Sequence, residues 1–477
     1  MATGIGRYDA WGSIDRAIGQ VAFDDVGRFT VQEQNHARER TDMNPPLPNS
    51  TLPIPALVNP LDEPDADVAT LMQSTSDRPV FTGEPGGRPT PLRVLFMLTS
   101  MPIGGAETLL ANLMRKMNPG RFSVELCCLK ELGPLGEELA ASFPTHSHLL
   151  SNKYDLRVLP RLIKRLRDRV DAVVTVGAGD KMFWGRLAGH LAGTPVVLSA
   201  LHSTGWPDGI GRLNRCLTAW TDGFIAVAPD HGRYLIEQEK LPSQKVFVIP
   251  NGVDTRRFQF DAAAAFSVRQ ELNIPVDAPV CGIIAALRPE KNHRLFLQVS
   301  RQILDRLPAA HFLVVGDGEE GPGLRAAAQE LNLGDRMHFL GSRSDIPRLL
   351  SAFNLFCLTS HNEANPVSIL EALSVRVPVV ATDVGSVSAT VIDGQTGFLA
   401  PAGDAHKFAE RALQILTEPK LAEQMGEFGR DQVVRHWSVE RMVRGYEQLI
   451  TAIYDQKRRG PGAAVSCDGV GFCGAAP

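Results

Sequence analysis

Short apolar runs recur along most of the chain and alternate with stretches in which apolar residues follow helical spacing. The first run is LRVLFML at 92–98, and the amphipathic stretch GGAETLLANLMRKM follows it at 104–117. Apolar runs of this length, bounded by Gly, Pro or Asp, are typical of parallel strands buried on both faces. The alternation therefore predicts an α/β fold in which helices cover both faces of a parallel sheet.

The alternation occurs twice, which predicts two doubly wound domains, at 91–250 and 251–435. The further strands expected are FSVELCCL, DAVVTV, TPVVLSAL, DGFIAV and KVFVIP in the first domain, and PVCGII, AHFLVVG, RMHFLG, NLFCLTS and VPVVATD in the second. In the second domain we expect helices at 293–306, 323–331, 344–351 and 366–374. A last amphipathic helix is expected at 436–457. Such domains bind ligands at the carboxyl ends of their strands, so we expect a cleft between the two sheets.

Both ends of the chain differ from this pattern. Eleven prolines lie among short polar residues at 45–91. Such a composition buries too little apolar surface to offset the entropy of ordering, so we expect 1–90 to be a mostly disordered extension. Its D-x-D pair, Asp65 and Asp67, lacks a strand to fix the two carboxylates, and we expect no metal there. The Gly- and Ala-rich segment 458–477 is likewise expected to be disordered.

Composition and charge narrow the possible functions. The 477 residues carry a formal net charge of −4; residues 1–90 account for −6 of it, so the remainder is +2. A nearly neutral body argues against a nucleic-acid partner. The seven cysteines form no C-x-x-C pair, as expected for reduced thiols in the cytoplasm. No apolar run approaches the roughly 18–20 residues of a membrane span, and no signal peptide precedes the first strand. We therefore expect a cytoplasmic protein.

Two candidate anion sites fall on turns between a strand and a helix. Gly104 and Gly105 open the helix after the first strand, where free amides and a close backbone approach suit an anion; a plain tight turn is the alternative. Arg288 and Lys291 follow the first strand of the second domain. Two cations at a strand end suit a diphosphate, although surface cations without a role are common.

The stretch SHNEANPVSILEAL at 360–373 places Glu363 and Glu371 on either side of a helix start. One interpretation is purely structural: Asn365 caps the helix and Pro366 takes its first position. The other is that both carboxylates and the positive helix end surround one ligand. In the first domain, His202 follows the strand TPVVLSAL, and both a structural and a functional role remain open for it.

In this order and spacing, the motifs resemble the retaining family-four glycosyltransferases of the GT-B fold, which consist of two Rossmann-like domains facing across a cleft. The resemblance covers about 93–454 and also rests on VIPNGVDTRRF, VVGDGEE, HFLGSRSDIPRLL, PVVATDVGS and DGQTGFL. It implies a metal-independent enzyme without a cofactor. The enzyme would move a hexose from a UDP- or GDP-sugar to a polysaccharide or lipid-linked acceptor, with retention of configuration.

The resemblance also implies a role for each candidate residue. Arg288 and Lys291 would stabilise negative charge on the departing nucleotide. Glu371 would accept hydrogen bonds from ribose hydroxyls, Glu363 would contact the transferred sugar, and His202 would lie beside the sugar or the acceptor. The remaining donor contacts would be the backbone at Gly104, Gly105, Asn365, Pro366, Val367 and Ser368. The last helix would cross back to the first domain.

Four positions depart from the family pattern. Ala286 stands where the family usually has an arginine, Ala364 and Arg376 replace usual glycines, and Ala389 replaces a usual glutamate. We expect Arg288 to take over the role vacated at position 286. The departures also keep alternatives open, namely a non-catalytic nucleotide-sugar-binding or scaffold paralogue and an epimerase or phosphorylase of the same fold.

The stretch RVLPRLIKRLRDR at 157–169 carries six cations and one acid. Its apolar residues recur at helical spacing, so the structural interpretation is a helix that covers the first sheet. The cations also suit an anionic surface, where each contributes on the order of 1 kcal/mol. We therefore hypothesise peripheral contact with the inner membrane face through this helix.

Overall fold

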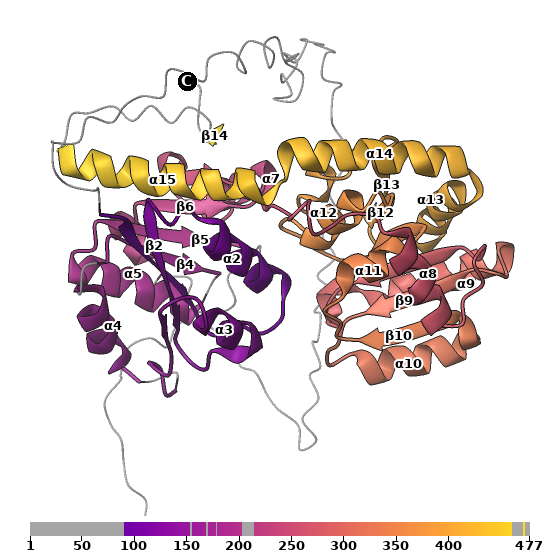
Figure 1. Cartoon of the computed structure of the whole chain (residues 1–477), viewed down its shortest axis with the longest axis horizontal. Coiled ribbons are helices and arrows are strands. Elements are labelled where there is room, and N and C mark those ends of the chain that lie inside the picture. Colours follow the sequence, from indigo (N-terminus) through magenta and orange to yellow (C-terminus); the bar gives the residue numbers. More distant parts are fainter. Residues whose placement is uncertain are drawn as a thin grey trace, which may run out of the picture. The chain divides into compact units, whose positions relative to one another are not determined.

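The computed structural model describes residues 90–152, 155–167, 170–177, 179–202, 214–459 and 471–472. The expected extension at 1–90, with its D-x-D pair, lies outside the described residues apart from residue 90. The prediction of two doubly wound α/β domains is confirmed (Figure 1).

The first domain contains β1 (Leu92–Leu98), α2 (Gly105–Lys116), β2 (Phe122–Cys128), α3 (Gly133–Ala140), β3 (Thr145–His146), α4 (Val158–Arg167), β4 (Ala172–Val176), α5 (Asp180–Ala192), β5 (Val196–Ala200), η1 (Leu217–Trp220), β6 (Gly223–Ala226), α7 (Pro229–Glu237), η2 (Ser243–Lys245) and β7 (Val246–Val248). Its strands lie in the order β3-β2-β1-β4-β5-β6-β7 and are all parallel. β14 (Gly471–Phe472) adds to β7 in the antiparallel direction.

The second domain contains α8 (Ala262–Glu271), β8 (Val280–Ile284), η3 (Pro289–Lys291), α9 (His293–Arg306), β9 (His311–Val315), α10 (Gly321–Glu330), η4 (Gly334–Arg336), β10 (Met337–Gly341), α11 (Ile346–Ser351), β11 (Leu355–Leu358), α12 (Val367–Ser374), β12 (Val379–Thr382), η5 (Val387–Ala389), β13 (Gly397–Ala400), α13 (Ala405–Thr417) and α14 (Pro419–His436). Its strands are parallel, in the order β10-β9-β8-β11-β12-β13. The chain ends in α15 (Val439–Arg459).

Both sheets reverse their winding direction at one point, between β1 and β4 in the first and between β8 and β11 in the second. At such a point the loops after two neighbouring strands turn to opposite faces of the sheet, which leaves a crevice for a ligand. The loops after β1, β8 and β11 carry most of the candidate residues. The topology thus places these residues at the ligand-binding ends of the two sheets.

The chain passes between the domains twice, and the two passages are hydrogen-bonded to each other. The Val253 amide donates to the Trp437 carbonyl at 2.8 Å, and the Val439 amide donates to the Val253 carbonyl at 2.9 Å. After the second passage, α15 lies along the first domain (Figure 1). Its buried residues, among them Met442, Tyr446, Leu449 and Ile450, join the hydrophobic core of the first sheet.

Three features differ from what the sequence pattern led us to expect. α13, α14 and β13 were not predicted as separate elements. Arg458, Arg459 and the β14 residues belong to regular elements, although we expected 458–477 to be disordered; the rest of that segment lies outside the described residues. Arg376, at a usual glycine position, adopts the left-handed φ of 65° that explains the family preference for glycine. Its side chain points outward, half-exposed, and pairs with Glu427 at 3.2 Å.

Candidate active site

An ion pair joins the loops that follow β8 and β11. Lys291 Nζ lies 2.6 Å from Glu363 Oε1, and the Ser360 hydroxyl donates to the same oxygen at 2.7 Å. Lys291 ends the short helix η3, while Glu363 is buried in the loop after β11. Because β8 and β11 flank the reversal point of the second sheet, this pair stands where an open α/β sheet binds its ligand.

The loop after β12 fixes the backbone of Glu363. The Ser386 amide donates to the Glu363 carbonyl at 3.0 Å. Gly385 has a φ of 56°, and a Cβ there would stand 1.9 Å from the same carbonyl oxygen, so only glycine allows this approach. Ser360, Gly385 and Ser386 were missed as site residues. Their motifs were visible in the sequence, but their contacts with Glu363 were not.

Two helix N-termini lie close together at the site. α12 begins at Val367, and α2 begins at Gly105. A Cβ on Gly105 would lie 4.0 Å from Val367 Cγ2, so the two first turns nearly touch. No side chain of the described segments caps either helix, so the first amides are available to an anion. Both helix ends carry partial positive charge toward the same place.

The structure corrects the capping interpretation of the helix start. Pro366 is the N-cap residue of α12 rather than its first helical residue, and Asn365 does not cap the helix. Instead, Asn365 Nδ2 donates to the Val227 carbonyl, just after β6, at 2.9 Å. Asn251 Nδ2 in turn donates to the Asn365 carbonyl at 3.0 Å.

Glu371 lies on α12 and is half-buried. Burial raises the pKa of its carboxyl from 4.5 to about 7, and the nearby Arg257 guanidinium opposes the rise only in part. A carboxylate without a strong cationic partner accepts hydrogen bonds from hydroxyl groups readily. The environment of Glu371 therefore suits a carboxyl group that binds a neutral polar ligand.

Two predicted site residues are not joined to the ion pair. Arg288 is exposed, and its guanidinium comes only within 3.9 Å of Glu290. His202 lies just after β5 in the first domain, and within the described part of the chain its buried Nδ1 has no hydrogen-bond partner. Burial, with His231 and Lys181 nearby, lowers the pKa of His202 to about 4, so its ring is neutral at pH 7. Gly104 is the N-cap residue of α2, and Ser368 lies in the first turn of α12.

No cluster of three or more potential metal ligands occurs among the described residues.

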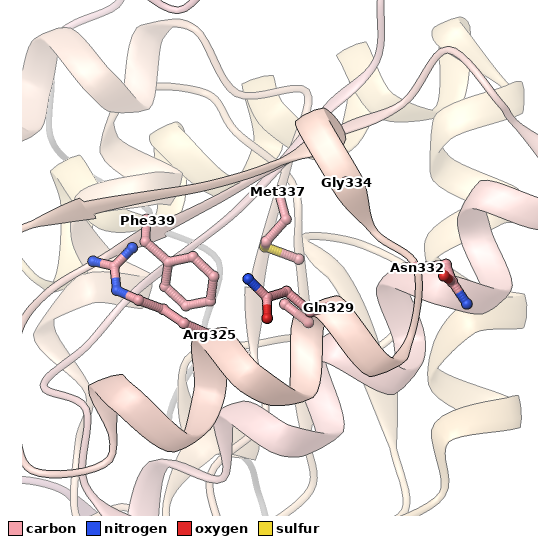
Figure 2. Close-up of a pocket in the computed structure, with 7 residues that line it drawn as sticks. Arg325, Gln329, Asn332, Gly334, Met337 and Phe339 are labelled. Atoms are coloured by element: carbon pink, nitrogen blue, oxygen red, sulfur yellow. The ribbon is translucent and has the colours of Figure 1, made fainter.

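A cavity of about 620 Å³ lies elsewhere, between α10 and β10 (Figure 2). Figure 2 shows Arg325 beside the Phe339 ring, and the guanidinium carbon lies 4.7 Å from the ring centroid. None of the predicted site residues lines this cavity, and we assign no role to it.

Comparison with known families matches both domains. The family described as Glycosyltransferase Family 4 matches residues 103–257, and the family described as Glycosyl transferases group 1 matches residues 266–432. These two matches follow the division into a first and a second domain.

Two individual relatives and one solved structure also match large parts of the chain. UDP-Gal:alpha-D-GlcNAc-diphosphoundecaprenol alpha-1,3-galactosyltransferase of Escherichia coli is 28% identical over 339 residues, which are 68% of this chain and 87% of that one. N-acetyl-alpha-D-glucosaminyl L-malate synthase of Bacillus anthracis is 29% identical over 218 residues, covering 46% of this chain and 55% of that one. The structure of Anabaena Alr3699/HepE in complex with UDP-glucose superposes with a TM-score of 0.68 at 21% identity, covering 76% of this chain and 99% of that one.

Proposed function

The chain belongs to the family 4 (group 1) glycosyltransferases of the GT-B fold, and from this premise we propose that it transfers a hexose from a UDP- or GDP-sugar to a lipid-linked or polysaccharide acceptor. The observation that carries the proposal is the Lys291–Glu363 pair at the reversal point of the second sheet, beside two uncapped helix N-termini. Departure of a nucleoside diphosphate builds negative charge on phosphate. Fixed cations and helix amides oppose that charge best in the transition state.

The residues take distinct roles in this proposal. Lys291 has three N–H donors and uses one on Glu363, which leaves the others for the donor phosphates. Glu363 thereby orients Lys291 and presents its carboxylate to the transferred sugar. Glu371 accepts hydrogen bonds from the ribose, and the amides at the starts of α2 and α12 bind the diphosphate. Lysine and helix amides supply the charge stabilisation that a metal ion gives in other transferases.

We propose that the transfer retains the anomeric configuration without a covalent sugar–enzyme intermediate. Glu363 Oε1 already accepts from Lys291 and Ser360, and these two bonds stabilise its negative charge. A carboxylate stabilised in this way is a weak nucleophile. The acceptor hydroxyl would therefore attack the anomeric carbon directly, from the side that the diphosphate leaves, and its proton would pass to the departing phosphate oxygen.

The acceptor proposal rests on the relatives. The Escherichia coli relative acts on a diphosphoundecaprenol-linked sugar by its name, so we propose an acceptor of the same chemical class. α4 offers a means of reaching such a lipid. Its residues Val158, Leu162 and Leu166 are buried in the first domain, which supports the covering interpretation for its apolar face. No described helix is long and apolar enough to cross a membrane.

The cations of α4 divide into two groups. Arg165 donates to the buried Glu125 at 2.8 Å, and Arg161 donates to Asp155 at 2.9 Å, so these two serve the fold. Arg157, Lys164 and Arg167 are exposed, and their side chains pair with no carboxylate of the described residues, although the Arg157 backbone amide donates to Asp155 at 3.1 Å. We propose that these three, beside the 71%-exposed Leu156, make peripheral contact with an anionic membrane.

The test is a donor and acceptor screen with the purified full chain. UDP-glucose, UDP-galactose, UDP-N-acetylglucosamine and GDP-mannose are each incubated with a polyprenyl-diphosphate-linked sugar, with and without EDTA. We expect transfer from one donor, undiminished by EDTA, and an α-linked product by NMR. An inactive paralogue would bind a nucleotide but transfer no sugar, and Ala286 together with the exposed Arg288 would explain that inactivity. Either this result or a loss of activity in EDTA overturns the proposal.

A further inference from the structure

The side chain of Asn365 ties the donor-binding helix start to the other domain. Asn365 precedes α12 in the second domain, and its Nδ2 reaches the carbonyl of Val227, at the end of β6 in the first domain. The two residues are 138 positions apart in the sequence. Asn365 is 7% exposed, so water does not compete for this bond.

Neighbouring hydrogen bonds hold both ends of this contact. On one side, Asn251, at the first passage between the domains, donates to the Asn365 carbonyl. On the other side, the Val227 amide donates to His231 Nδ1 at 3.3 Å, and His231 is itself buried on α7. The Asn365–Val227 hydrogen bond therefore joins two segments that are each held by further hydrogen bonds.

A neutral side chain with a hydrogen-bond donor suits this position. A carbonyl oxygen needs a donor opposite it, and asparagine supplies one while remaining neutral. Asn365 Oδ1, by contrast, is buried and has no hydrogen-bond partner among the residues that the structure describes. A buried acceptor left unmet costs free energy, so the residue is not one that packing alone would favour.

We propose that Asn365 is a positioning residue, which holds the start of α12 against the end of β6 so that donor and acceptor meet in a fixed geometry. This inference rests on the proposed function. Lys291, Glu363 and Glu371 all belong to the second domain, so the side chains proposed to bind the donor come from that domain, and the first domain adds the α2 amides. Transfer also needs the acceptor at the first domain, and a misplacement of about 1 Å between reacting groups can cost 10²-fold in rate.

The variant Asn365→Asp keeps the size of the side chain but replaces the donor with an oxygen facing the Val227 carbonyl. We expect kcat for transfer to fall 10- to 100-fold, while the affinity for UDP, measured by calorimetry, falls by a smaller factor, because the new aspartate and the α2 amides also affect the diphosphate. Asn273→Asp, at an exposed turn of the second domain, is the matched control and should change neither value. Transfer within twofold of wild type overturns the proposal, and so does an equal loss of UDP affinity, which would make Asn365 a donor contact.

Hydrogen–deuterium exchange gives a second readout that needs no activity. In Asn365→Asp, peptides covering 225–232 and 363–370 should both exchange faster than in wild type and in Asn273→Asp. Unchanged exchange in both peptides overturns the tether. If the wild type transfers no sugar from any donor, the proposed function fails, and the exchange result still decides whether Asn365 holds the two segments together.

Discussion

The substitution Glu371→Gln tests whether the ionised carboxylate of Glu371, on α12, lowers the stability of the folded chain. The pKa of Glu371 is raised from 4.5 to about 7 in the folded chain. The folded state therefore binds the proton more tightly than the unfolded state, and this group's contribution to stability is lost as pH rises from about 4.5 to above 7. The difference between a pKa of 4.5 and one of about 7 corresponds to roughly 3 kcal/mol, which is an upper limit because the half-buried carboxyl keeps some contact with water.

Glutamine removes the charge and keeps the shape. At pH 8 we expect Glu371→Gln to be more stable than wild type by about 1–3 kcal/mol, with the gain falling below about 1 kcal/mol at pH 5. The assay is thermal unfolding from pH 5 to pH 8, with the exposed Glu330→Gln as control. The same variant should bind UDP-sugar about 10- to 150-fold more weakly, since it loses a charge-assisted hydrogen bond. A melting temperature that does not rise at pH 8, or a gain that does not depend on pH, would refute the reasoning.

Three further predictions concern single features. Arg376→Gly should raise stability by about 1 kcal/mol, since glycine relieves the left-handed backbone and the exposed pair with Glu427 contributes little; urea unfolding that shows no gain contradicts this. Arg288→Ala should lower transfer about 10²-fold if it replaces the arginine absent at 286, and a near-normal rate would leave the chemistry to lysine and helix amides. Replacing three cations of α4 with glutamine should abolish co-sedimentation of the protein with anionic vesicles at low salt; the three are Arg157, Lys164 and Arg167. If this variant pellets as well as wild type, the membrane proposal is excluded.

Local signals predicted the fold well where the pattern was long. The helix expected at 293–306 is α9 with the same bounds, since apolar spacing continues through all its turns. The start of α12 was placed one residue early because a proline fits both the N-cap and the first helical position, and only the backbone dihedrals decide. β13 was missed because four residues among glycines give too short a run.

The site was predictable in part for a topological reason. Lys291 and Glu363 are 72 residues apart, yet both follow strands, and strands that flank a reversal point bring the loops after them together. The Asn365–Val227 contact has no such rule behind it, because it depends on how one domain meets the other. The role of Arg288 stays a prediction, because its long side chain is exposed and no close contact holds it in one direction among the described residues.

The central claim is that the donor diphosphate binds at Lys291, between the starts of α2 and α12. Calorimetric titration of UDP and GDP into wild type, Lys291→Ala and the exposed-lysine control Lys420→Ala tests it most directly. Loss of a charge-assisted contact worth roughly 1.5–3 kcal/mol predicts that Lys291→Ala binds the preferred nucleotide at least 10-fold more weakly, while Lys420→Ala matches wild type. Equal affinity in wild type and Lys291→Ala would contradict the account.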